Sequence, residues 1–146
     1  MENPAPHYDP IDLGWEKLDE IGYPKSMGLF WRKPDGQGAL YGLLATNDHL
    51  NQNGLNQNGR VHGATILGLV DHALGHTARD FGVNQLKATV QLDTQFIHSP
   101  AAGDFLVARG FLVRQTRSIL FMRCEITAGE KLVATANGLW KLLGIN

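Results

Sequence analysis

Apolar and polar residues recur along this chain with periods that are typical of helices and strands. Across residues 63–81, apolar side chains cover almost the whole circumference of a helix, which predicts a long helix buried on nearly every side. Gly82 is a plausible cap for its C-terminal end. Apolar residues at helical spacing within 11–21 predict a short amphipathic helix that ends near Gly22, because Pro24 cannot continue it.

The other apolar runs are typical of strands. Residues 26–33 and 38–46 flank a turn at Pro34-Asp35-Gly36, which predicts a hairpin. Short turns separate four further strand-like runs, at residues 88–97, 104–115, 118–127 and 132–142. This order predicts an α+β fold in which a curved antiparallel sheet of about six strands wraps around one long central helix. The length fits a single domain over residues 1–146, with residues 1–10 as a flexible arm.

Composition and charge narrow the classes of function. The formal net charge is −1 and no basic stripe stands out, so nucleic-acid binding has no electrostatic support. No run approaches the roughly 18 apolar residues that a membrane span needs, and the N-terminus lacks the pattern of a secretory signal. The single cysteine, Cys124, lies in an alternating apolar segment and is interpreted as buried filler. We therefore expect a cytoplasmic protein without membrane or nucleic-acid partners.

Asp71 interrupts the apolar surface of the predicted central helix. A buried carboxylate is costly unless it is paired or used. In a structural interpretation, His72, His76 or a backbone donor satisfies the charge. In a functional interpretation, Asp71 belongs to an active site, where rules of burial are often broken. At the start of the helix, Gly63 and Ala64 are small enough for a ligand to approach free backbone N–H groups, which suit a carbonyl oxygen that gains negative charge.

An ordered set of motifs resembles a known family. It begins with Asn56-x-x-Gly59-x-x-His62-Gly63, continues with Asp71 and Thr89-Val90-x-Leu92 with Phe96, and ends with Gly103-Asp104. This set resembles the hotdog thioesterases of the phenylacetate-pathway type, and the resemblance runs from about residue 50 to residue 140. It implies a hotdog fold and an acyl-CoA thioesterase, which hydrolyses an acyl-CoA thioester to a free acid and coenzyme A.

The resemblance also implies how the site is assembled. In such enzymes two subunits pair edge to edge with the active sites across the interface, which implies a homodimer or a homotetramer built as a dimer of dimers. Open sheet edges favour the same pairing. Asp71 would be the nucleophile or the base that activates water, and the Gly63 N–H would polarise the thioester carbonyl. Asn56 and His62 would orient the loop, the carbonyl or the water, and Thr89 would hold water beside the partner subunit's Asp71. No metal or cofactor is implied, since coenzyme A is part of the substrate.

Some positions depart from the family pattern or lie beside it. Ala64 replaces the usual second glycine at the helix start and is a candidate substrate contact. One extra residue between Phe96 and Pro100 suggests a β-bulge. Several arginines come from the last strands, and Arg117 is the one we select as a contact for the coenzyme A phosphates. Ordinary solvated strand charge is the alternative, and the simpler, explanation of these arginines.

His72 and His76 lie four residues apart on one face of the predicted helix. Zinc is often bound by such pairs, but the glutamate of the H-E-x-x-H motif is missing, and Asp71 points about 100° away from His72. We therefore expect no metal here. Instead, we expect one histidine, with His72 the candidate, to contact the substrate or the subunit interface, or to hydrogen-bond Asp71.

Two other functions stay open. A hydratase or dehydratase of the same fold also acts on acyl-CoA, and it would use a carboxylate–imidazole pair such as Asp71-His72. A catalytically silent acyl-CoA-binding protein would bind the same molecule without turnover. Thiol release from acyl-CoA, with Asp71→Ala as the control, separates both from a thioesterase.

Overall fold

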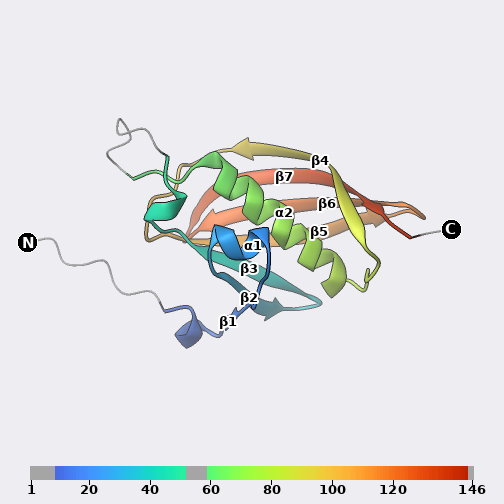
Figure 1. Cartoon of the computed structure of the whole chain (residues 1–146), viewed down its shortest axis with the longest axis horizontal. Coiled ribbons are helices and arrows are strands. Elements are labelled where there is room, and N and C mark those ends of the chain that lie inside the picture. The colour runs from blue at the N-terminus through green and yellow to red at the C-terminus, as the bar shows by residue number, and fades with distance from the viewer. Residues whose placement is uncertain (1–8, 52–58, 145–146) are drawn as a thin grey trace, which may run out of the picture.

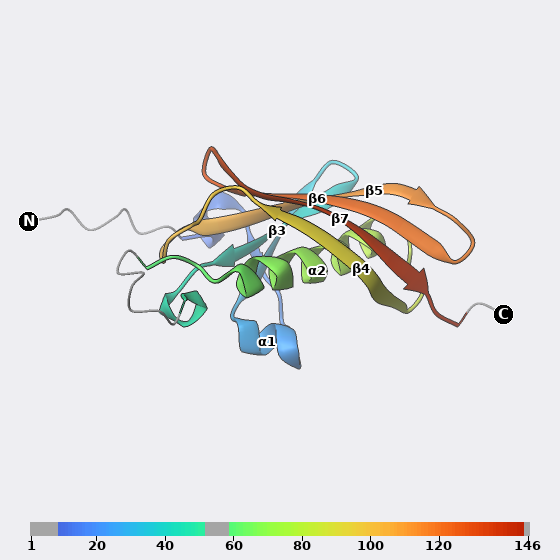
Figure 2. The same ribbon diagram turned by 90° about the horizontal axis from the view of Figure 1, so that it is seen from above.

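The apolar segment in the middle of the chain forms the helix around which the fold is built. The computed structural model describes residues 9–51 and 59–144. The long helix, α2, spans Gly63–Asp80 and crosses the concave face of a seven-stranded antiparallel sheet (Figures 1 and 2). This arrangement confirms the predicted fold class, with seven strands in place of about six.

The order of strands in the sheet is β1-β2-β3-β5-β6-β7-β4, so β1 and β4 are the two edges. The strands span Glu16–Lys17 (β1), Phe30–Asp35 (β2), Gly38–Leu44 (β3), Lys87–Phe96 (β4), Phe105–Gln115 (β5), Ile119–Ala128 (β6) and Lys131–Leu142 (β7). A five-residue helix, α1 (Tyr23–Met27), and two 3₁₀ turns, η1 (Ile11–Leu13) and η2 (Asn47–His49), complete the described elements. None of the helices among these residues is long and apolar enough to cross a membrane.

Only one face of α2 is buried. Its buried side chains recur as adjacent pairs about one turn apart, which places them on a single stripe against the sheet: Thr65, Ile66, Leu69, Val70, Ala73, Leu74, Thr77 and Ala78. The expectation of a helix buried on nearly every side is therefore wrong. Asp71 belongs to the opposite face and is exposed in the single chain.

Hydrogen bonds define both ends of α2. His62 is the N-cap, and its ring Nδ1 accepts a hydrogen bond from the Ala64 N–H at 2.9 Å. At the other end Gly82 has a φ of +92°, and its N–H donates to the carbonyl of Arg79. The Val83 N–H donates to the carbonyl of Ala78, which completes a Schellman motif and confirms Gly82 as the C-terminal cap.

α2 packs closely against the sheet at Gly110 of β5. A Cβ at this position would lie 2.9 Å from Leu74 Cδ2 and closer still to Thr77 Oγ1, so only glycine leaves room for the helix. Thr77 is almost fully buried, and its hydroxyl donates to the Ala73 carbonyl at 2.9 Å. The sheet is therefore shaped to receive α2 at this point.

The N-terminal segment differs from its predicted structure. The helix expected over residues 11–21 is wrong: the chain forms η1 and then β1, which pairs with β2. The helix α1 begins only after Gly22, and Pro24 lies in its first turn, where a missing N–H costs nothing. α1 packs on the side of α2 that faces away from the sheet (Figure 2).

The strand predictions agree with the structure to within a few residues. The hairpin of β2 and β3 forms as expected, although Pro34 and Asp35 belong to the strand and Gly36 carries the positive φ of the turn. Cys124 is fully buried, which confirms its interpretation as filler. After β4, the N–H groups of Ile97 and His98 both donate to the carbonyl of Val133, the irregularity expected of a β-bulge.

Candidate active site

Asp71 pairs with a hydroxyl from the edge strand. The Thr89 hydroxyl donates a hydrogen bond to Asp71 Oδ1 at 2.6 Å, and both residues are exposed. The two belong to the same chain, whereas Thr89 was expected to lie beside the partner subunit's Asp71. The bond engages one carboxylate oxygen, and the other has no hydrogen bond from the residues that the structure describes, so it can act on a ligand.

A β-bulge explains why Thr89 reaches the helix. Strict alternation along β4 would place Thr89 opposite to Leu92 and Phe96, on the outer face of the sheet. The register with β7 shifts between Thr89 and Gln91, so Val90 is an extra residue in the ladder. This shift turns Thr89 to the inner face, where it meets α2. The sequence pattern could not locate this bulge.

A pocket of about 270 Å³ lies beside the pair. Asp71 and Thr89 line it together with Gly75, which lies one turn after Asp71 and leaves the helix surface bare. Arg79 and Lys87 supply two positive charges to the same pocket. Burial, and then the neighbouring charge of Arg79, lowers the pKa of Lys87. The pocket therefore joins a carboxylate to a cationic wall that could hold an anionic ligand.

The start of α2 forms a separate region. The Ala64 N–H is occupied by the His62 ring, and of the residues that the structure describes none accepts a hydrogen bond from the Gly63 N–H. Because Nδ1 of His62 is the acceptor, a neutral ring carries its proton on Nε2, which is then a donor. The ring of Phe96 lies against Gly63, 3.4 Å from where a Cβ would be. The Gly63 N–H and the His62 Nε2–H therefore lie beside the C-terminal end of β4.

The two regions are too far apart in one chain to act on the same atom. Eight residues of helix separate Gly63 from Asp71, which is about 12 Å along the axis. Ala64 lines a different pocket, which Met27 and His49 share, and not the pocket beside Asp71. A complete site that uses both Asp71 and Gly63 therefore requires two subunits.

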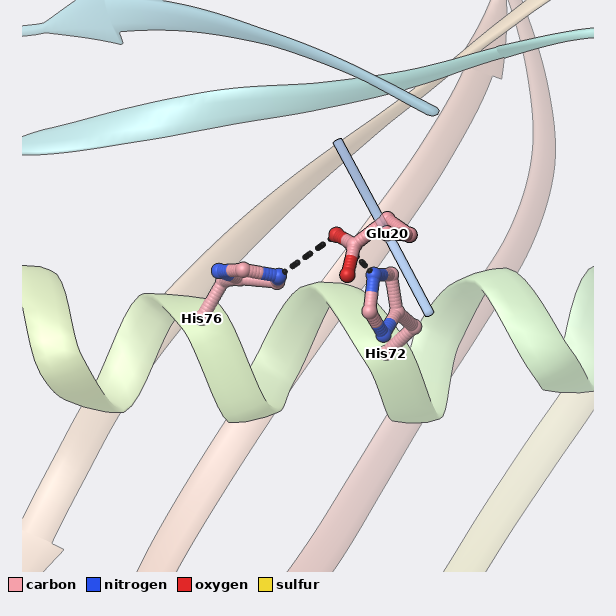
Figure 3. Close-up of side chains that lie close together, drawn as sticks. All are labelled: Glu20, His72 and His76. Atoms are coloured by element: carbon pink, nitrogen blue, oxygen red, sulfur yellow. Dashed lines mark hydrogen bonds and ion pairs between the residues drawn. The ribbon is translucent and has the colours of Figure 1, made fainter. Parts of the chain in front are cut away.

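His72 and His76 converge on a residue that the sequence did not single out (Figure 3). Glu20, between β1 and α1, places its Oε1 2.7 Å from His72 Nε2 and 3.0 Å from His76 Nε2. The expected hydrogen bond between a histidine and Asp71 is not among the interactions of the described residues. Distance along the chain hid this contact, since 52 residues separate Glu20 from His72.

The remaining sequence candidates lie elsewhere. Arg117 is in the turn between β5 and β6 and does not line the pocket beside Asp71. Asn56 lies outside the described residues. The basic side chains at the pocket, Arg79 and Lys87, were missed; the signal for Arg79 was its position two turns after Asp71 on the same side of the helix.

The fold consists of one long helix wrapped by a curved antiparallel sheet, and an aspartate–threonine pair lies where the helix meets an open edge strand. These features place the protein in the hotdog class. The model of the Thioesterase superfamily matches residues 58–135, more than half of the chain. The chain belongs to the thioesterase superfamily. Among curated proteins, none matches the sequence.

Solved structures share the fold at low sequence identity. A conserved protein of Pseudomonas aeruginosa has a TM-score of 0.73 and 21% identity, over 85% of this chain and 95% of that one. The PaaI protein from the phenylacetic acid degradation operon of Escherichia coli has a TM-score of 0.71 and 21% identity, over 84% of each chain. A hypothetical thioesterase from Streptococcus pneumoniae, solved with coenzyme A, has a TM-score of 0.69 and 21% identity, over 80% of this chain and 88% of that one.

Proposed function

We propose that this protein is an acyl-CoA thioesterase whose active site lies between two copies of the chain. The observation that carries the proposal is the Asp71–Thr89 pair, which stands at an open pocket with Arg79 and Lys87 on its wall. A carboxylate is suited to activate water, and two cations are suited to hold the phosphates of coenzyme A. Membership of the thioesterase superfamily and the coenzyme A complex of the S. pneumoniae protein support this substrate class. A cytoplasmic location is the prediction that goes with it.

The exposed edge of β4 is the surface through which two copies would pair. β4 is ten residues long, and no strand among the described residues pairs with its outer side. Large apolar side chains on or just after it are more than half exposed: Val90, Phe96 and Ile97. An edge of this length with apolar side chains is stabilised when a second strand covers it.

The positions of the two half-sites support one register for such a dimer. Asp71 lies beside Thr89, and Gly63 lies beside Phe96, near the two ends of β4. If two β4 strands pair antiparallel around Asp93, the bulged end of one strand faces the Phe96 end of the other. Asp71 then comes next to the partner subunit's Gly63, which completes the site.

In this arrangement the reaction uses side chains, one backbone N–H and water. The thioester carbonyl oxygen accepts hydrogen bonds from the Gly63 N–H and from His62 Nε2, which stabilise the negative charge that develops on it. The partner subunit's Asp71 removes a proton from water as the water oxygen bonds to the carbonyl carbon. The C–S bond then breaks, and the proton passes to the thiolate, which gives the free acid and coenzyme A. Direct attack by the carboxylate, followed by hydrolysis of the anhydride, gives the same products.

Thiol release from a panel of acyl-CoA thioesters tests the activity. Wild type should release thiol, and Asp71→Asn, which keeps the shape and the Thr89 contact, should lose at least about a hundredfold in kcat, as expected for a base or nucleophile. Asp12→Asn, which makes the same chemical change in the exposed turn η1, serves as the control. Equal rates for wild type and Asp71→Asn would remove Asp71 from the mechanism. Binding without turnover would instead indicate an acyl-CoA-binding protein.

A cysteine at the proposed axis tests the dimer. Paired antiparallel strands bring opposite Cα atoms to about 4.5–5.5 Å, within reach of a disulfide. The Asp93→Cys variant should therefore form a covalent dimer on mild oxidation, whereas Glu130→Cys, in the turn before β7, should not. The native Cys124 is buried and does not interfere. A monomer at equal yield in both variants would contradict this register.

The hydratase alternative loses its structural basis. It depends on a pair formed by Asp71 and His72, but His72 is bonded to Glu20 and Asp71 is bonded to Thr89. Formation of a hydrated acyl-CoA without thiol release would nevertheless bring that function back.

A further inference from the structure

Glu20, His72 and His76 form a second polar cluster, separate from the Asp71–Thr89 pair. We propose that this cluster binds a divalent transition-metal ion of the Zn²⁺ class through Glu20 Oε1, His72 Nε2 and His76 Nε2. The sequence argued against a metal because the H-E-x-x-H glutamate is missing. The fold supplies a glutamate from another part of the chain, and the proposal does not depend on the thioesterase activity.

The three donor atoms converge on one point. The two histidine nitrogens lie 2.7 and 3.0 Å from the same carboxylate oxygen, and all three donors lie within 4.8 Å of one another. Zinc bonds of about 2.0–2.2 Å at tetrahedral angles would separate ligands by about 3.4 Å. Each histidine nitrogen therefore needs to move away from the carboxylate oxygen by only about 0.4–0.7 Å. Two histidines and one glutamate are also the ligand set of known zinc sites.

Neighbouring rings hold the two imidazoles in place. His72 packs against the ring of Phe30 with centroids 4.5 Å apart, and His76 stacks on Tyr41 at 5.1 Å with an interplanar angle of 26°. The two histidine rings are nearly perpendicular, at 86°. Both project from one rigid helix, one turn apart, so little conformational freedom is lost when they bind an ion.

The charges also suit a cation. Metal binding requires a deprotonated carboxylate and neutral imidazoles. The cluster supplies one carboxylate and two imidazoles, which together offer one negative charge and two nitrogen lone pairs to a cation. Side-chain exposures of 16–21% make the cluster partly shielded yet accessible to an ion.

A bound ion would tie the segment before α1 to the middle of α2. Glu20 lies between β1 and α1, in a stretch whose nearest backbone tie to the sheet is the bond from Leu18 N–H to Phe30 carbonyl. Three protein ligands leave one position for water. Because His72 and His76 also line the pocket beside Asp71, metal binding would order one wall of that pocket.

Glu20→Gln separates a metal site from a hydrogen-bonded cluster. The glutamine carbonyl can still accept hydrogen bonds from both imidazoles, so a cluster held by hydrogen bonds alone keeps its stability. An amide is a far weaker metal ligand than a carboxylate. His76→Gln is the second cluster variant. Glu130→Gln is the matched control for Glu20→Gln, and His98→Gln is the matched control for His76→Gln, because each control makes the same chemical change outside the cluster.

Tag-free protein is first stripped of metal with a chelator. Equilibrium dialysis and calorimetry then measure the binding of Zn²⁺ and Co²⁺, and the absorption spectrum of bound Co²⁺ reports the coordination number. We expect one ion per chain in wild type and both controls. Both cluster variants should bind at least about tenfold more weakly. At a hundredfold excess over Kd, Zn²⁺ should raise the Tm of wild type by about 5 °C or more, reversed by chelator.

Two results would overturn the proposal. If wild type binds less than one ion per chain at micromolar Zn²⁺, the cluster is not a specific metal site. Glu20→Gln that is folded by circular dichroism and binds as tightly as Glu130→Gln would exclude Glu20 as a ligand. Thiol release need not change in either case, so failure of the metal proposal is distinguishable from failure of the proposed thioesterase.

Discussion

Replacement of Thr89 by valine removes the hydroxyl that holds Asp71 and leaves the shape of the side chain. The bond at 2.6 Å joins a neutral donor to a carboxylate, and such bonds contribute about 1.5–3 kcal/mol. Both residues are exposed in the single chain, so the lower end of this range applies. A loss of about 1.4 kcal/mol from the transition state lowers kcat/KM about tenfold. Thr89→Ser keeps the hydroxyl and should stay near the wild-type rate.

The same strand offers a matched control in Thr94. Its hydroxyl is buried and has no hydrogen-bond partner among the residues that the structure describes. It projects to the inner face of β4, as Thr89 does, because it pairs with the buried Ala136 of β7. Thr94→Val therefore removes an unsatisfied polar atom and should raise the free energy of unfolding by about 1 kcal/mol with kcat/KM unchanged.

Steady-state thiol release with one good acyl-CoA substrate measures all three variants, at equal subunit concentration. The reasoning predicts a decrease confined to Thr89→Val. If Thr89→Val stays within twofold of wild type, the hydrogen bond does not position the reacting carboxylate. If Thr94→Val loses as much activity as Thr89→Val, the effect belongs to the strand and not to the contact with Asp71.

Three further predictions follow from the packing and charges. Gly110→Ala should lower the free energy of unfolding by about 1–3 kcal/mol in urea titrations, because the new methyl overlaps the Thr77 side chain. Combined with Thr77→Ala it should cost less than the sum of the two single losses, and additive losses would argue against this clash. Arg79→Ala and Lys87→Ala should each raise KM for acyl-CoA about two- to fivefold, which corresponds to the free energy of an exposed ion pair. Neither change should raise KM for a short thioester that lacks phosphates. Burial raises the pKa of the Cys124 thiol to about 12, so iodoacetamide at pH 8 should modify the chain only after unfolding; labelling of the native protein would contradict the burial.

Local patterns determined most of the architecture. The long helix, its glycine cap at Gly82 and the four C-terminal strands were readable because each element buries one face and its side chains repeat with the period of that element. The prediction failed over residues 11–21, where the apolar spacing fits a helix, but pairing of β1 with β2 gives the chain a better partner. The motif order also identified the superfamily and selected Asp71.

Only the tertiary structure decided how the site is assembled. The bulge at Val90 turns Thr89 toward Asp71, and a change of register leaves no mark in a pattern of apolar and polar residues. Glu20 meets His76 across 56 residues of sequence because the N-terminal segment folds back over the helix. The sequence fixes the period of each element and hence which side chains share a face. The contacts between faces depend on how the whole chain packs, which is why Asp71 and Thr89 could be selected from the sequence but their contact within one chain could not.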